Sequence, residues 1–345
     1  MNENQNNVLQ HVDDEIDLRE LIMVFWRQRK LIITITLIAA ILTGLFSMFV
    51  LSPVYDTKLN IVINMPEKYN TRYGEYTLPI TTNEQYIELI KSNDVLANTI
   101  RDMEYMDGEV TIEDFKESIS IGKVETKTGV TQNSFDITVS ADDAQESLKL
   151  AKTLYNNYIE FMDVMTKERA ISFYYNDFSV QLKSLNNTLD KTKRILEKNE
   201  ELLAQTPQTI NQKEAMQAIQ GNTSEYVVLE NIINPNYTKI ESDVIANKQS
   251  IINIESSINL FNDYLEEITS EKVTMAKYYD TGSATKLESS IIGVVETSVY
   301  LPSPPVAPTK KTSPSNTRNV ALGTVLGAMI AIMVVFIKDY WLKKS

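Results

Sequence analysis

Residues Leu31–Leu51 read LIITITLIAAILTGLFSMFVL, a run without a charged side chain. As a helix, this run would be about 31 Å long, close to the thickness of the hydrocarbon core of a bilayer. A buried core helix and a cleaved signal peptide are the two alternatives. The run is too long for the first, and the mostly polar residues 1–30 precede it without a small-residue cleavage pattern. The stretch therefore predicts a membrane-spanning helix.

A second uncharged run, VALGTVLGAMIAIMVVFI at Val320–Ile337, predicts a second membrane-spanning helix. Within it, Gly323 and Gly327 form a G-x-x-x-G pair, which either brings a neighbouring helix close or arises by chance. Basic residues stand just outside both runs, and the positive-inside rule then places both termini in the cytoplasm and the residues between the spans outside it. These basic residues are Arg27, Arg29, Lys30, Lys338, Lys343 and Lys344.

The composition argues against most catalytic chemistry. The 345 residues include no cysteine and one histidine, His11, so disulfides, thiolate metal sites and histidine-based catalysis are not expected. A net charge of −13 argues against a nucleic-acid partner. No phosphate-binding loop and no G-x-S-x-G motif occurs. Paired carboxylates such as Asp142 and Asp143 or Glu266 and Glu267 diverge on a helix, which argues against glycosidase chemistry. We expect no enzyme, cofactor or metal ion.

Strand and helix patterns alternate in residues 52–165. Residues Tyr55–Asn64 and Ser134–Ser140 show the alternation of half-buried strands. Apolar residues at helical intervals predict a helix over residues 83–103, with Asn83 as its cap. This mixture predicts a compact α/β base domain.

Two further helices are expected in the same region. A short helix should begin at Thr111 and run into a strand, and a longer one should follow a cap at Asp142 or Asp143.

The pattern changes to long helices in residues 166–280. Mostly apolar residues repeat at alternating spacings of four and three from Phe178 to Leu203 and from Ile233 to Ile268, which predicts two long helices packed as a hairpin. Pro207 should end the first helix. The second should open with Pro235 in its first turn, capped by Asn234.

Residues 281–301 should return to the base domain, because Ile291–Leu301 is apolar enough to add a strand. Half of the ten prolines then fall between Pro302 and Pro314, and residues 302–319 should be an extended, semi-rigid tether into the second span.

The expected fold class is an α+β membrane protein in which two transmembrane helices flank an extracytoplasmic α/β base domain with a long projecting helical hairpin. The expected segments are a cytoplasmic N-terminal segment 1–30, transmembrane helix 31–51, base 52–165, hairpin 166–280, return strand 281–301, proline-rich segment 302–319, transmembrane helix 320–337 and cytoplasmic tail 338–345.

Four features of the chain resemble the Wzz-type chain-length determinants, also called polysaccharide co-polymerases. They are EIDLRELIMVFWRQRKLI before the first span, PVYDTKLNIVI after it, NPNY at Asn234–Tyr237, and PSPPVAPTKKTSPSNTRN before the second span. The family's Asp-Pro before one helix is Asp143-Ala144 here. Either Pro308 or Pro314 matches the family's Ser-Pro position. The motif residues carried over are Pro304, Pro305, Pro308, Ser313, Pro314 and Asn319, with Asn234, Pro235 and Tyr237 at the start of the hairpin helix.

The resemblance implies a ring-like homo-oligomer in the bacterial cytoplasmic (inner) membrane that sets the chain length of a surface polysaccharide such as O-antigen, capsule or exopolysaccharide. Its expected partners are membrane lipid, a polysaccharide polymerase and the growing glycan chain. The alternative is an adaptor that activates a separate cytoplasmic tyrosine kinase through residues 1–30 and 338–345. A two-span chemoreceptor is disfavoured because no signalling domain follows the second span.

Overall fold

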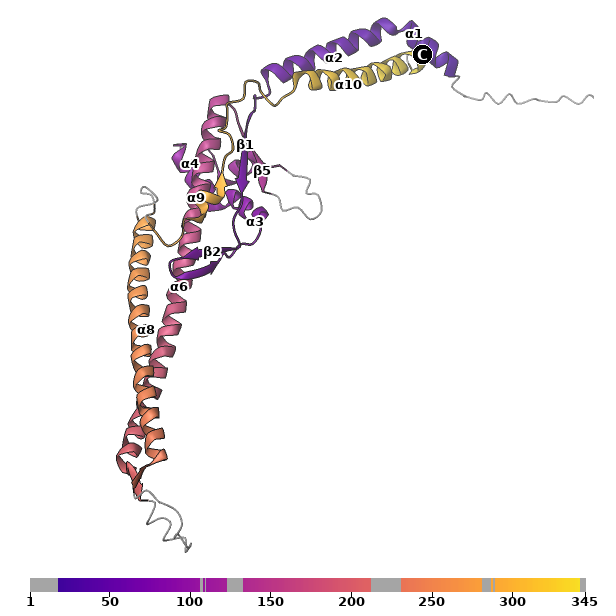
Figure 1. Cartoon of the computed structure of the whole chain (residues 1–345). Coiled ribbons are helices and arrows are strands. Elements are labelled where there is room, and N and C mark those ends of the chain that lie inside the picture. Colours follow the sequence, from indigo (N-terminus) through magenta and orange to yellow (C-terminus); the bar gives the residue numbers. More distant parts are fainter. Residues whose placement is uncertain are drawn as a thin grey trace, which may run out of the picture. The chain divides into compact units, whose positions relative to one another are not determined.

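The computed structural model describes residues 18–105, 108, 110–122, 133–211, 231–280, 287 and 289–341. The chain divides into two compact units, each assembled from segments that are distant in the sequence (Figure 1). The first unit comprises Met1–Ile61, Ile90–Asn156 and Leu301–Ser345, and the second comprises Val62–Leu89 and Asn157–Tyr300.

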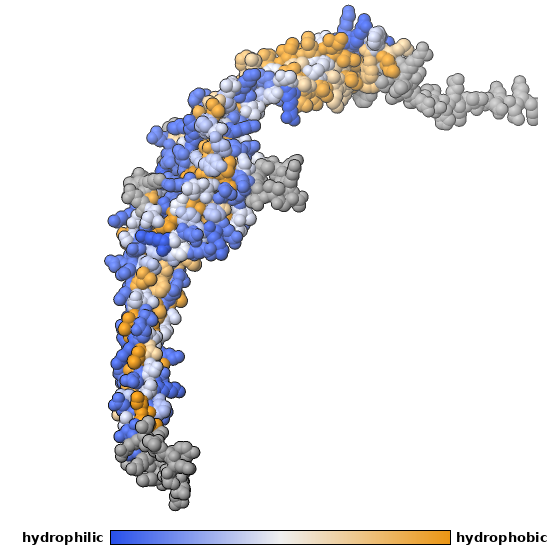
Figure 2. Space-filling model, viewed as in Figure 1, coloured by the Kyte–Doolittle hydropathy of each residue, from blue (hydrophilic) through white to orange (hydrophobic). Residues whose placement is uncertain are grey.

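A pair of apolar helices forms one part of the first unit. Helix α1 (Leu18–Arg27) leads into α2 (Arg29–Phe49), and α10 (Asn316–Phe336) continues into a π-helical turn, Ile337–Trp341. Helices α2 and α10 lie side by side (Figure 1), and the face of this pair that Figure 2 shows is mostly apolar. Both are long and apolar enough to cross a membrane, at the positions that the two uncharged runs predict.

A small sheet forms the rest of the first unit. Strands β4 (Ile119–Ile121) and β5 (Ser134–Ala141) pair antiparallel, and β5 lies next to β1 (Tyr55–Ile63), in the order β4-β5-β1. Along β1, alternate side chains are buried, as the sequence predicts. Helices α4 (Asn93–Asp102), α5 (Ile112–Ser118) and the first turns of α6 (Ala144–Gln205) complete this unit. Its buried core includes Leu59, Ile61, Val95, Leu96, Phe115, Ile137, Val139, Leu150 and Leu154.

Local capping signals set several helix starts. Thr111 and Asp114 form a reciprocal capping box at α5, and the helix runs directly into β4, as predicted. Of the two cap candidates for α6, Asp143 is the one that binds, because its carboxylate accepts hydrogen bonds from the backbone N–H groups of Gln145 and Glu146 at 2.8 and 3.1 Å. These bonds lower the pKa of Asp143.

The single helix expected over residues 83–103 is wrong. The structure has α3 (Asn83–Glu88), a 3₁₀ turn at Leu89–Lys91 and then α4, because Ser92 adopts an extended backbone that restarts the helix. The cap of α3 is also Thr82 rather than Asn83, since the Thr82 hydroxyl accepts the hydrogen bond from the Gln85 N–H group.

Two long helices dominate the second unit. Helix α6 ends at Gln205, just before Pro207, and α8 (Pro235–Asp280) begins after Asn234, so both predicted boundaries are confirmed. The helices run alongside each other (Figure 1), with ion pairs Lys193–Glu255 and Lys248–Glu200 across them. Residues of both repeating series are half-buried or buried, apart from the expected first member Ile233, which is exposed in a strand.

Short strands accompany these helices. Strands β6 (Thr209–Asn211) and β7 (Asn231–Ile233) pair antiparallel, as do β2 (Lys68–Thr71) and β3 (Gly74–Thr77) in a hairpin that the sequence did not predict. The expected boundary between a base and a hairpin at residue 165 stays a prediction, because α6 passes through it without a break.

The strand expected over Ile291–Leu301 is largely wrong. Five of its eleven residues form α9 (Val294–Ser298), and only β8 (Val299–Tyr300) pairs, antiparallel, with the end of β1. The buried residues at 294, 295 and 298 follow a helical period, which favours a turn of helix over a strand.

Candidate functional site: the apolar helix pair and its proline-rich approach

Glycines let α10 pack directly on α2. A Cβ atom added to Gly323 would overlap the side chain of Thr43, and one added to Gly327 would lie 2.5 Å from the Cβ atom of Ala39. Both glycines are buried against the facing helix. On α2, a Cβ atom added to Gly44 would lie 3.2 Å from the Cγ2 atom of Val320, which is a tight contact rather than an overlap. The G-x-x-x-G pair therefore lies in the helix contact, where only a hydrogen atom fits.

Polar side chains join the pair next to the proline-rich segment. Ser47 is buried, and its hydroxyl accepts a hydrogen bond from the Asn319 amide at 2.8 Å and donates one to Asn316 Oδ1 at 3.1 Å. Lys311 donates to the same Asn316 oxygen at 3.2 Å. A buried hydroxyl in an apolar helix needs such partners, so these contacts fix the register of α2 against α10.

Charged and aromatic side chains join the opposite end of the pair. Arg27, at the end of α1, forms an ion pair with Asp339, which follows α10. Phe25 packs edge-on against Phe336, with ring centroids 5.5 Å apart. Both ends of the pair are thus held by specific contacts.

The proline-rich segment is extended and is tied to the start of the sheet. The Val54 N–H group donates to the Ser313 carbonyl at 2.8 Å, and the Thr312 N–H group donates to the Val54 carbonyl at 2.8 Å. The Ser313–Pro314 peptide bond is cis. Ser315 then caps α10 by accepting from the Arg318 N–H group.

The predicted motif residues of this segment differ in their surroundings. Pro304 and Ser313 are exposed, Pro305 and Pro308 are half-buried, and Pro314 is buried. The structure brings Ser313, Asn319 and the two glycines against residues 36–54.

The other predicted residues belong to the second unit and cap α8. The Asn234 carboxamide accepts from the Asn236 N–H group at 3.0 Å and donates to the Pro207 carbonyl at 2.7 Å. Pro235 occupies the first turn of α8, and Tyr237 is half-buried against the hairpin core. This cap joins the end of the α6 segment to the start of α8.

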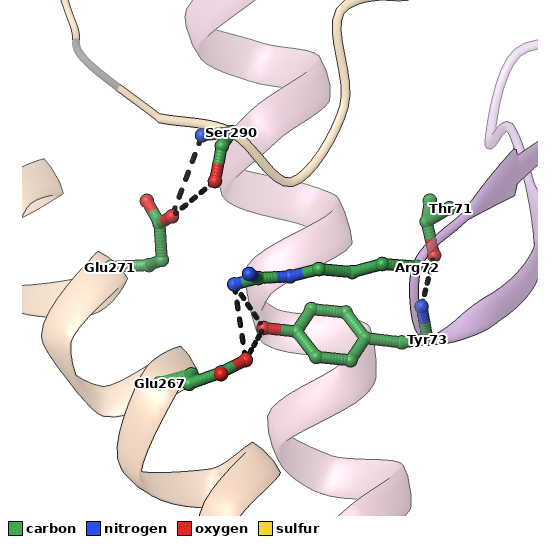
Figure 3. Close-up of polar contacts among 6 residues, drawn as sticks. All are labelled: Thr71, Arg72, Tyr73, Glu267, Glu271 and Ser290. Carbon is green, nitrogen blue, oxygen red and sulfur yellow. Dashed lines mark hydrogen bonds and ion pairs between the residues drawn. The ribbon is translucent and has the colours of Figure 1, made fainter.

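A cluster of polar and aromatic side chains lies at the turn of the β2–β3 hairpin, and the sequence does not predict it (Figure 3). The Tyr73 hydroxyl donates to Glu267 Oε2 at 2.7 Å, and Arg72 forms an ion pair with the same carboxylate oxygen at 3.1 Å. The Tyr73 ring contacts three further rings, those of Tyr174, Phe178 and Tyr264. Burial of the ring and the bond to Glu267 raise the pKa of Tyr73 to about 12. No local pattern signals this cluster, because its members are far apart in the sequence.

Two pairs of adjacent tyrosines in the second unit, Tyr174–Tyr175 and Tyr278–Tyr279, make internal contacts. Tyr174 is 2% exposed and shares a hydrogen bond with Thr71. The Tyr278 and Tyr279 hydroxyls donate to Glu160 and Glu168. Lys272 lies over the Tyr175 ring at 4.0 Å. Each of these four tyrosines therefore has a partner within the second unit.

A comparison with protein families agrees with the motif resemblance. Residues 14–103 match the family model "Chain length determinant protein" (Wzz). A comparison with curated protein sequences finds no match.

Several solved structures are similar to the chain. A full-length bacterial polysaccharide co-polymerase is 13% identical, with 95% of this chain and 99% of that chain covered, at a TM-score of 0.45. The wild-type lipopolysaccharide O-antigen chain-length regulator WzzBSF of Shigella flexneri is 12% identical, covering 74% and 100%, at 0.30. A fragment of WzzB, a polysaccharide co-polymerase from Salmonella Typhimurium, is 9% identical, covering 76% and 100%, at 0.27.

The stretch that matches the family model runs from the segment before α1 to the end of α4 and contains α2 and β1. It holds two of the four motifs quoted above, the one before the first span and the one after it. Residues 14–103 of this chain are therefore similar to the Wzz family of chain length determinant proteins.

Proposed function

We propose that this protein regulates the chain length of a bacterial surface polysaccharide, as a non-catalytic scaffold that works with a polysaccharide polymerase and contacts the growing glycan. The observation that carries the proposal is the match of residues 14–103 to the chain length determinant model.

The proposal includes a membrane topology. Helices α2 and α10 cross the cytoplasmic membrane, both termini are cytoplasmic, and the residues between the helices are extracytoplasmic. The basic residues flanking the two helices support this orientation. The large apolar side chains exposed along both helices, such as Leu37, Leu42 and Met329, support contact with lipid.

The scaffold is a ring-like homo-oligomer. Apolar residues seven positions apart are exposed on α6 (Ile195 and Leu202) and again on α8 (Ile245 and Ile252). Such repeats outside the hairpin core suit packing against a second copy of the chain. Light scattering of the full chain in detergent should give a multiple of the 39.2 kDa subunit mass. A monomeric mass would contradict the oligomer.

Deleting the gene tests the function. Gel analysis of the surface polysaccharide should show a modal length distribution in the parent strain and its loss in the deletion strain. Restoring the wild-type gene should restore the mode. An unchanged distribution after deletion would overturn the proposal.

Substitutions in α10 link the function to the helix pair. Gly323→Leu and Gly327→Leu should fail to restore the mode, because their side chains overlap Thr43 and Ala39. Ala321→Leu adds a comparable side chain at an exposed position of the same helix and should restore it. Immunoblots of membrane fractions should be used to check that all three variants accumulate to the same level.

A further inference from the structure

A groove of about 550 Å³ opens on the second unit, a volume within the roughly 300–1,000 Å³ typical of small-ligand sites. One wall is α6, which contributes Arg169, Ser172, Phe173 and Asn176. The other wall is the end of β3 and the residues after it, including Tyr76. All of these residues lie within one compact unit.

An exposed aromatic ring lies in this groove. The Phe173 side chain is 47% exposed although the core of the unit is adjacent. Tyr76 and Tyr174 contact its ring, with centroids 5.4 and 5.1 Å away, so the ring is held in place. Tyr76 itself is 3% exposed. The groove thus offers a fixed apolar surface to solvent, which is a preorganised feature for a ligand with an apolar face.

Polar side chains surround that ring on the same face of α6. Positions 169, 172, 173 and 176 are three, four and seven residues apart, which places them on one helical face. Arg169, Ser172 and Asn176 are exposed, and the described residues supply none of these three side chains with a hydrogen bond. They provide guanidinium, hydroxyl and carboxamide groups, which together offer both donors and acceptors.

We propose that this groove binds a saccharide unit of the glycan, with Phe173 under the sugar ring and Arg169, Ser172 and Asn176 bonded to its hydroxyl groups. A sugar ring has an apolar C–H face and a rim of hydroxyls, and the groove pairs one ring with several donors and acceptors. An interface with a second copy of the protein would need a broader apolar patch, whereas this groove presents a single apolar ring among polar groups. The proposal rests on the proposed function, since it assigns the glycan a contact site.

Binding can be measured with the full chain in detergent and oligosaccharides prepared from the surface polysaccharide of the source strain, by saturation-transfer NMR and calorimetry. Phe173→Ala should weaken binding by about tenfold or more, and Phe173→Trp should retain it because it keeps an aromatic face. Asn176→Ala should weaken it by roughly twofold to tenfold, as expected for one hydrogen bond. The control is Val180→Ala, at a residue that is 68% exposed on α6 outside the groove, and it should bind as wild type.

The outcomes separate this site from the proposed function. If the wild-type chain binds no oligosaccharide, or if Phe173→Ala binds as tightly as wild type, the groove is not a glycan site, even where gene deletion abolishes the modal length. If Phe173→Ala leaves binding intact but lowers the oligomer mass in light scattering, the groove is an interface between copies and the proposal is overturned. An unchanged length distribution after gene deletion counts against the proposed function alone.

Discussion

The Tyr73→Ala substitution should release the β2–β3 hairpin from the long helices. Tyr73 lies in the tight turn between the two strands, and its ring contacts Tyr174 and Phe178 on α6 and Tyr264 on α8. Its hydroxyl donates to Glu267 on α8. One side chain thus holds the turn against both helices.

The magnitude follows from the interactions that the Tyr73 side chain makes. Three aromatic pairs at about 0.5–1.5 kcal/mol each, and a hydrogen bond to a half-exposed carboxylate at about 1 kcal/mol, give an upper sum of roughly 5.5 kcal/mol. Because the ring is only half-buried, we expect Tyr73→Ala to lower the local stability by about 2–4 kcal/mol. At about 1.4 kcal/mol per tenfold, amide exchange in residues 68–77 should accelerate by roughly 30-fold to 700-fold.

Hydrogen-exchange mass spectrometry of the full chain in detergent measures this change. The control is Tyr69→Ala on the same hairpin, because Tyr69 is half-buried but makes no ring contact or side-chain hydrogen bond within the described residues. Tyr73→Phe keeps the ring and should accelerate exchange only about fivefold, for a loss of about 1 kcal/mol. Equal acceleration in Tyr69→Ala and Tyr73→Ala would refute the role assigned to the Tyr73 contacts.

Three further predictions concern the second unit. Lys167 and Asp163 form a nearly buried ion pair at 2.7 Å with side chains 6% and 12% exposed, so Lys167→Ala should lower the unfolding free energy by about 3–5 kcal/mol. The double change Lys167→Met with Asp163→Leu should stay close to wild type in thermal unfolding, and an equal loss in both would contradict the pairing. Asn234→Ala should cost about 1–2 kcal/mol at the start of α8 and speed exchange there, whereas Asn234→Asp should restore only the bond from the Asn236 N–H group, because a carboxylate cannot donate to the Pro207 carbonyl. Because the pKa of Tyr73 is raised from 10.0 to about 12, the unfolded chain ionises first and stability should fall as the pH rises through this window; in denaturant titrations, Tyr73→Phe should show a smaller fall.

The sequence predicts those parts of the fold whose cause is local. The uncharged runs of α2 and α10 mark two apolar helices, since composition alone determines them. Asn234 and Pro235 mark the start of α8, because an Asx cap and a first-turn proline act within four residues.

Other features depend on contacts that no sequence window contains. The apolar period continues through residues 83–103, so nothing local reveals the break at Ser92. The β2–β3 hairpin has the polar sequences KYNT and GEYT, whose pairing depends on Tyr73 and Tyr76 reaching α6. Residues 294–298 form a helix because of which side chains are buried, and a short apolar run does not distinguish that from a strand.

The candidate site likewise has one part that the sequence predicts and one part that only the structure shows. The sequence places Gly323 and Gly327 on one helix face, but only the structure supplies Thr43 and Ala39 as their neighbours. The contacts of Ser47 with Asn316 and Asn319 were not predicted, because they join residues at opposite ends of the sequence.

Because α6 is unbroken, the length of the helical hairpin that α6 and α8 form can change only in certain steps. Within a 62-residue helix, inserting one residue turns everything after it by about 100°, which would move the half-buried series from Leu182 to Leu203 away from α8. Seven residues add two nearly whole turns and restore the phase, but only if α8 gains seven as well. Longer or shorter hairpins of this kind should therefore differ by seven residues in each of the two helices, which changes the hairpin length by about 10 Å.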